Sequence, residues 1–195
     1  MHLPAILTVC ALLATSLGYS DDLPQALAAE PTIAALGASI DSKEGRFKVQ
    51  LPAGFSETDM EVQPIQTEMG EIETVNYTSF SDTGATMVGT SEYPEALLVF
   101  IKGKEREVLE GAEEGALRNV SGTVVTEEEQ TVSGFPARSV EFTAEADGQP
   151  LFGKALFILA ENRLYHILFI TSNRADINSD GITQFFQSFK IASSP

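Results

Sequence analysis

Alternation of apolar and polar residues runs through much of the chain and predicts β-strands. The first such segment, residues 45–52, has one apolar face, made of Phe47, Val49 and Leu51. Residues 61–94 are rich in Val, Thr, Ile, Tyr and Phe and are interrupted at Gly70 and at residues 82–84. Because turn residues separate β-branched and aromatic runs, this region predicts three more strands in a meander.

Three further strands are predicted in the second half of the chain, at residues 135–146, 150–160 and 163–172. The last two are apolar on both faces, which is typical of central strands in a sheet that is covered on two sides. We therefore expect these strands and the final helix to bury one shared set of side chains, namely Phe157, Leu164, Leu168, Phe185 and Phe189.

Two segments have helical spacing instead. Residues 104–118 place an apolar stripe on one side, made of Val108, Leu109, Ala112, Ala116 and Leu117. The acidic residues of this helix, and the run Glu127, Glu128 and Glu129, are interpreted as solvated surface. A second helix is predicted after residue 178. Together the patterns predict an α+β fold in which an antiparallel β-sheet is flanked by helices in a layered sandwich.

The N-terminal region predicts export. Residues 3–17 form an apolar run of signal-peptide length, and an A-x-A arrangement follows at residues 26–28. We expect residues 1–28 to be a signal peptide, 29–44 a linker and 45–193 the folded domain. Cleavage would remove Cys10, the only cysteine, and would leave a periplasmic or extracellular protein with no transmembrane segment in the mature chain.

Charge restricts the choice of partner. The formal net charge is -16, from 28 acidic and 12 basic residues. A negative surface field repels the phosphates of nucleic acids and anionic lipid headgroups, so both are poor partners. An unidentified protein or envelope component is the expected partner.

The residue types for catalysis are scarce. His166 would be the only histidine of the mature chain, and its strand-like neighbourhood predicts a half-buried side chain satisfied by one hydrogen bond. Triads and zinc sites need an imidazole or several His and Cys ligands, so we expect no enzyme and no cofactor. A hydrolase that uses only carboxylates, or Ser and Tyr, stays open.

One stretch, DINSDGITQFFQ at residues 176–187, resembles the start of a calcium loop. Asp176, Asn178 and Asp180 fit the first three ligand positions of an EF-hand, but Gln187 occupies the position of the bidentate glutamate. Helical spacing also begins inside the loop, at Ile182, Phe185, Phe186 and Phe189. We therefore predict no metal site and a helix capped by Ser179 or Asp180, with a calcium site as the alternative.

Three short motifs carry a resemblance to a known family: G-x-P-A at residues 134–137, N-R-L-Y at 162–165 and S-F-K-I at 188–191. With the order of strands and helices, they resemble the PsbP-like and DcrB-like exported domains, whose fold is shared with a Ran-binding nuclear-import factor. The resemblance covers residues 45–193. It implies an antiparallel sheet flanked by helices and a non-catalytic role, and it implies no photosynthetic role, since no cofactor-contacting residues match.

These observations predict an exported, non-enzymatic binding or accessory domain of unknown ligand. Two alternatives remain at this point. One is a small exported hydrolase that uses carboxylates or Ser and Tyr, and the other is a calcium-dependent binding module.

Overall fold

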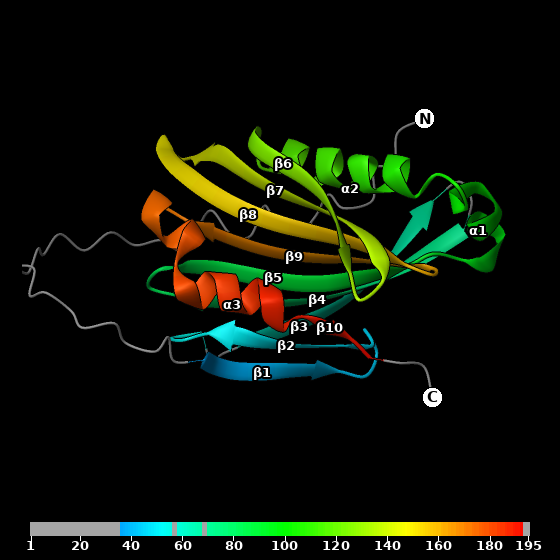
Figure 1. Ribbon diagram of the computed structural model, residues 1–195, viewed down its shortest axis with the longest axis horizontal. Coiled ribbons are helices and arrows are strands. Elements are labelled where there is room, and N and C mark those ends of the chain that lie inside the picture. The colour runs from blue at the N-terminus through cyan, green and yellow to red at the C-terminus, as the bar shows by residue number, and fades with distance from the viewer. Residues whose placement is uncertain (1–35, 56–57, 68–69, 193–195) are drawn as a thin grey trace, which may run out of the picture.

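A computed structural model describes residues 36–55, 58–67 and 70–192, which form two antiparallel β-sheets with helices on both sides of the larger one (Figure 1). The larger sheet has seven strands in the order β3-β4-β5-β9-β8-β7-β6. Their bounds are Thr58–Thr67 for β3, Gly70–Ser81 for β4, Gly84–Glu92 for β5, Thr123–Val132 for β6, Phe135–Ala146 for β7, Gln149–Ala160 for β8 and Arg163–Thr171 for β9. The predicted α+β fold, with an antiparallel sheet flanked by helices, is confirmed.

The smaller sheet and the helices complete the described fold. The small sheet has the order β1-β2-β10, with bounds Leu36–Ser42, Phe47–Pro52 and Lys190–Ile191. The helices are α1 (Glu95–Ile101), α2 (Glu105–Asn119), the 3-10 helix η2 (Arg174–Asn178) and α3 (Asp180–Ser188). Among the described residues, no helix combines the length and the apolar character that a membrane crossing would need.

Tight turns set the register of the hairpins around β7. Ser133 and Gly134 join β6 to β7, and Asp147 and Gly148 join β7 to β8, with positive φ angles at all four residues. Two successive residues with positive φ match the right-handed twist of paired strands, which is why Gly is favoured in the second place. The ladders accordingly begin right beside the turns, at Val132 opposite Phe135 and at Ala146 opposite Gln149.

The strand β9 lies at the centre of the large sheet, between β5 and β8. All nine of its residues are buried. A strand whose side chains alternate between the two faces can be buried throughout only when both faces are covered. The prediction that this apolar segment is a central strand is therefore confirmed.

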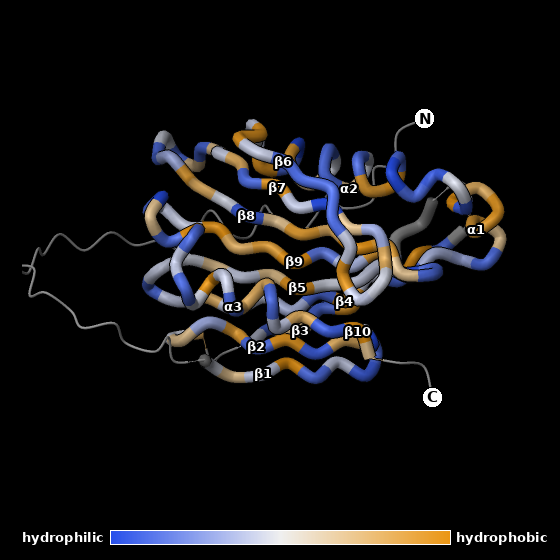
Figure 2. The backbone as a smooth tube through the Cα atoms, in the orientation of Figure 1, coloured by the Kyte–Doolittle hydropathy of each residue, from blue (hydrophilic) through white to orange (hydrophobic). Residues whose placement is uncertain are grey.

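Each face of the large sheet has its own core. On one face, called here the α3 face, α3 and the small sheet pack against β5, β8 and β9; this core includes Phe47, Tyr165, Ile167, Phe185 and Phe189. On the other, called the α2 face, α1 and α2 pack against the sheet; this core includes Leu109, Leu117, Phe157, Leu164 and Leu168. Figure 2 shows apolar residues concentrated along the inner strands β8 and β9.

The expected single core was wrong in one respect. Its five predicted members are all buried, but Phe157, Leu164 and Leu168 lie on the α2 face, whereas Phe185 and Phe189 lie on the α3 face. The reason is the two-residue period of a strand. The residues of β9 that meet α3 are the intervening ones, such as Tyr165 and Ile167.

The folded region also begins earlier than residue 45. β1 lies within the predicted linker and pairs with β2, with Ile40 opposite Val49. Small residues such as Gly37 and Ala38 weaken its alternation, so the pattern alone did not reveal it. The expected signal peptide, residues 1–28, lies outside the described residues.

Candidate binding site

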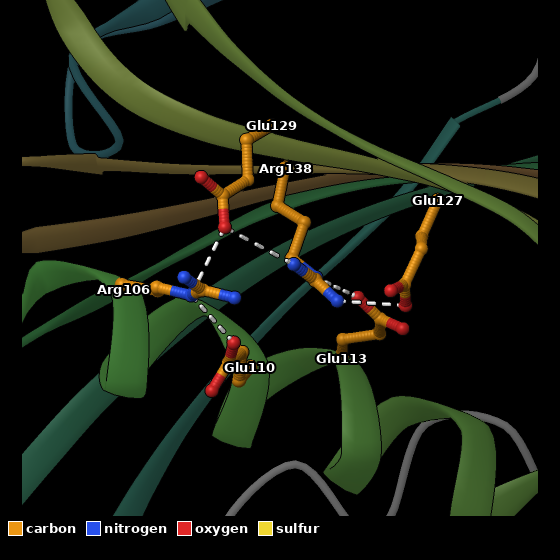
Figure 3. Close-up of polar contacts among 6 residues, drawn as sticks. All are labelled: Arg106, Glu110, Glu113, Glu127, Glu129 and Arg138. Carbon is orange, nitrogen blue, oxygen red and sulfur yellow. Dashed lines mark hydrogen bonds and ion pairs between the residues drawn. The ribbon is translucent and has the colours of Figure 1, made fainter.

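The strongest concentration of charge in the described residues lies on the α2 face, around Arg138 of β7. Residues 138, 140 and 142 of β7 point toward α2, because they alternate with residues that point the other way. Only 8% of Arg138 is exposed. Its Nε donates to Oε2 of Glu113, its Nη2 donates to Oε2 of Glu127 at 2.7 Å, and its Nη1 lies 3.7 Å from Oε1 of Glu129 (Figure 3).

Glu113 is buried because of its place on α2. It lies one turn after Leu109 and one turn before Leu117, so it belongs to the stripe that faces the sheet. The interpretation that the acidic residues of this helix are all solvated was therefore wrong for Glu113, of which 4% is exposed. An unpaired carboxylate would be very unfavourable there, and the guanidinium of Arg138 supplies the necessary partner.

A second layer of ion pairs surrounds this buried one. Arg106 of α2 donates from its Nε to Oε1 of Glu110 at 2.8 Å and lies 3.0 Å from Oε1 of Glu129 on β6 (Figure 3). Near the end of α2, Arg118 donates to Glu114 at 2.7 Å. The interpretation of the run at residues 127–129 as solvated surface was thus incomplete. The side chains of Glu127 and Glu129 are half exposed, but both pair with arginines.

The balance of charge at this site is negative. Five carboxylates pair with three guanidinium groups, which leaves an excess of two negative charges; the residues are Glu110, Glu113, Glu114, Glu127 and Glu129 with Arg106, Arg118 and Arg138. Burial by itself lowers the pKa of Arg138, but the hydrogen bonds and charges of Glu113 and Glu127 more than offset it and hold the pKa above its usual value. Arg138 therefore stays charged and cannot transfer a proton near neutral pH.

An open cavity of about 330 Å³ lies beside Arg138, between α2 and the strands β6 and β7. Five of its eight lining residues are charged, namely Glu110, Glu113, Glu114, Arg118 and Arg138, and the other three are Leu117, Gly122 and Val124. This volume is at the lower end of the range for small-ligand sites. We call the surface formed by α2, β6 and this cavity the α2–β6 face.

His166 lies farther along the same face of the sheet, on β9. It is 3% exposed, and its Nε2 lies 2.9 Å from Oδ1 of Asn76 on β4. Burial lowers the pKa of His166 to about 4, so its imidazole is neutral at physiological pH. The predicted single hydrogen bond is present. The prediction of a half-buried side chain was wrong, because β9 is covered on both faces and His166 is therefore fully buried.

Gly89 allows that hydrogen bond to form. It lies on β5, between Asn76 and His166, and a Cβ there would stand 2.3 Å from Oδ1 of Asn76 and 2.4 Å from Nε2 of His166. Only glycine leaves room for two side chains to meet above the intervening strand. The pair is therefore a structural link between β4 and β9 and is closed to solvent.

The residues of the calcium-like stretch take part in other contacts. The carboxylate of Asp176 accepts from Nδ2 of Asn173 at 3.3 Å, and Oδ1 of Asn178 accepts from Nζ of Lys154 at 3.3 Å. Of the two predicted caps of α3, Ser179 and Asp180, the structure has Ser179. Its side chain accepts a hydrogen bond from the amide of Ile182. Asp180 lies in the first turn of the helix. The segment before Ser179 is the 3-10 helix η2, which the sequence pattern did not predict.

Comparison with known proteins gives structural similarity only. No protein-family model and no curated protein matches the chain. The solution structure of cyanobacterial PsbP (CyanoP) from Synechocystis sp. PCC 6803 is similar at 12% identity and a TM-score of 0.49, over 85% of this chain and 98% of that chain. A protein of unknown function from Pseudomonas aeruginosa, PA94, described as a putative regulator, is similar at 12% identity and a TM-score of 0.35, over 72% of this chain and 85% of that chain. At these levels neither similarity supports a statement about function.

Proposed function

We propose that this protein is an exported, non-enzymatic binding or accessory domain that holds a basic protein partner on its α2–β6 face. The observation that carries the proposal is the cavity between α2 and β6–β7, within an ion-pair network that has an excess of two negative charges. Opposite charge on a partner steers its approach and selects it against acidic competitors.

The state of the reactive groups supports binding over catalysis. His166 is enclosed, neutral and bonded to Asn76, and the carboxylates that contact Arg138 are acceptors in ion pairs. A general acid or base must reach the proton of a substrate, and a nucleophile needs such a base beside it. The groups of the α2–β6 face are suited instead to recognition of charge.

Export and the accessory role are part of the same proposal. They rest on the signal-like N-terminal sequence and on the resemblance of residues 45–193 to exported PsbP-like and DcrB-like domains. The acidic composition agrees with a protein that must remain soluble outside the cytoplasm.

Crosslinking of the native complex tests the proposal. A carbodiimide joins carboxylates to nearby amines, so treatment of the host's envelope or medium should couple the partner's lysines to Glu110 or Glu114, as mass spectrometry would show. The variant Glu110→Gln together with Glu114→Gln should lose this product, whereas Glu145→Gln together with Glu161→Gln should keep it. Crosslinks confined to the α3 face, or turnover of a small substrate by the purified protein, would contradict the proposal.

A further inference from the structure

The strand β6 forms one edge of the seven-stranded sheet. Among the described residues it pairs with β7 alone, so its other side presents backbone N–H and C=O groups to solvent. Residues 123–131 of this strand are all exposed. In Figure 1 the strand runs along the outside of the sheet beside α2, and in Figure 2 it is largely hydrophilic.

The opposite edge of the sheet is protected in a way that β6 is not. The edge strand β3 contains Pro64, which has no backbone N–H and interrupts any further ladder. β6 contains no proline, and its only irregularity is a register shift between Val124 and Thr126. The segment from Thr126 to Val132 is therefore a regular ladder edge, available to another extended chain.

The side chains along this segment determine which chain can pair with it. Glu127 and Glu129 point toward α2 and contact arginines, whereas Glu128 points to the other side of the sheet and forms no ion pair with a described residue. A second copy of this protein would bring its own acidic run close to the first, and like charges on neighbouring strands destabilise pairing. An extended segment rich in Lys or Arg would gain both the backbone hydrogen bonds and favourable charge pairs.

We propose that β6 binds an extended, basic segment of a partner protein, which adds to the sheet as an eighth strand beside Thr126–Val132. This inference rests on the proposed function and specifies how the partner binds. Strand addition supplies affinity through main-chain hydrogen bonds, and the acidic run supplies the preference for a basic sequence. The same acidic run keeps copies of this protein from pairing with one another.

Backbone methylation of a probe peptide separates strand pairing from simple attraction of charge. The probe is a fluorescein-labelled synthetic peptide in which lysine alternates with threonine, and its binding to the full chain is followed by fluorescence anisotropy. Two further peptides carry N-methyl groups on every second residue, in the two possible phases. In a strand only alternate N–H groups face the neighbour. One methylated peptide should therefore lose about tenfold or more in affinity, and the other should bind within about twofold of the parent.

A charge reversal on the protein provides the matched control. Glu128→Lys should weaken binding of the parent peptide about fivefold, while Glu107→Lys, the same change on an exposed position of α2, should alter it less than about twofold. Circular dichroism would check that both variants are folded.

Three outcomes would overturn strand addition. They are equal binding of the two methylated peptides, equal effects of the two charge reversals, and no binding of the parent peptide. Carbodiimide crosslinks to the α2–β6 face would still support the proposed function in any of these cases. The failure of strand addition is thus distinguishable from failure of the binding role.

Discussion

The two faces of the large sheet differ in the kinds of side chain that they bury. The α3 face packs aromatic rings against one another, with the ring centroid of Phe189 5.5 Å from those of Phe47 and Tyr165. The α2 face also has an apolar core, but it buries the ion pair of Glu113 and Arg138 and the hydrogen bond of His166 and Asn76. Apolar packing tolerates many substitutions of similar volume, whereas a buried charged or polar group requires one particular partner.

This difference assigns different roles to the faces. On the α3 face, loss of volume should be the main source of instability, and pH should matter little. On the α2 face, stability should depend on protonation and on keeping partners together. The charged groups there continue outward into the α2–β6 face, where an exposed surface can use them for binding.

The largest expected effect is a truncation on the α3 face. Phe185 is fully buried, so Phe185→Ala should lower the free energy of unfolding by about 3–5 kcal/mol through lost burial and a residual cavity. Chemical denaturation measures this change. The control is Phe100→Ala on α1, where the residue is 63% exposed and a change below about 1 kcal/mol is expected. Equal losses in the two variants would refute the layered arrangement.

The next effect is a pH dependence that originates on the α2 face. The pKa of His166 is lowered from 6.5 to about 4, so the unfolded chain takes up a proton at a pH where the folded chain does not. Its contribution to stability is complete above pH 6.5 and is lost as the pH falls from 6.5 to 4, by roughly 3 kcal/mol in total. Between pH 6.5 and 4, the free energy of unfolding of the protein should fall by that amount, whereas that of His166→Gln should lack this fall. Parallel pH profiles would show that His166 is not buried as a neutral group.

A smaller effect is expected when the buried ion pair loses its carboxylate charge. Glu113→Gln should cost about 2 kcal/mol, because Arg138 remains buried but keeps the carboxylates of Glu127 and Glu129. Glu107→Gln, on the exposed side of the same helix, should change stability by less than about 0.5 kcal/mol. If both substitutions were neutral in urea denaturation, the guanidinium of Arg138 would have to be solvated.

The smallest effect concerns the start of α3. Ser179→Ala should cost about 1 kcal/mol, because the first turn loses the side-chain acceptor for the amide of Ile182. Asp176→Ala should change stability less. Neither result should depend on calcium or chelator, and calcium should leave the Tm unchanged, since a ligand that does not bind the folded state cannot stabilise it. A Tm that rises with calcium, and loss of that rise in Asp176→Ala, would restore the calcium alternative.

The local pattern of the chain determined most of the secondary structure. The strands β2, β3, β4, β5, β7, β8 and β9 and the helices α2 and α3 were predicted from periodicity and composition within each segment, because an element that packs on a core has at least one apolar side. The pattern did not predict β1, β6, β10, α1 or η2. β6 is exposed along nearly its whole length, and β1 is made mostly of small and polar residues.

The tertiary structure alone decided which elements meet. Periodicity shows that a helix or strand has a side to bury, but it does not say against which partner, so the division of the predicted core between two faces could not be read from it. The same holds for the binding site. Glu113 and Arg138 are separated by 25 residues, and each looks like an ordinary surface charge in the sequence. They become a buried pair only because α2 crosses β7 at that point, where the low polarity of the interior makes each charge require the other.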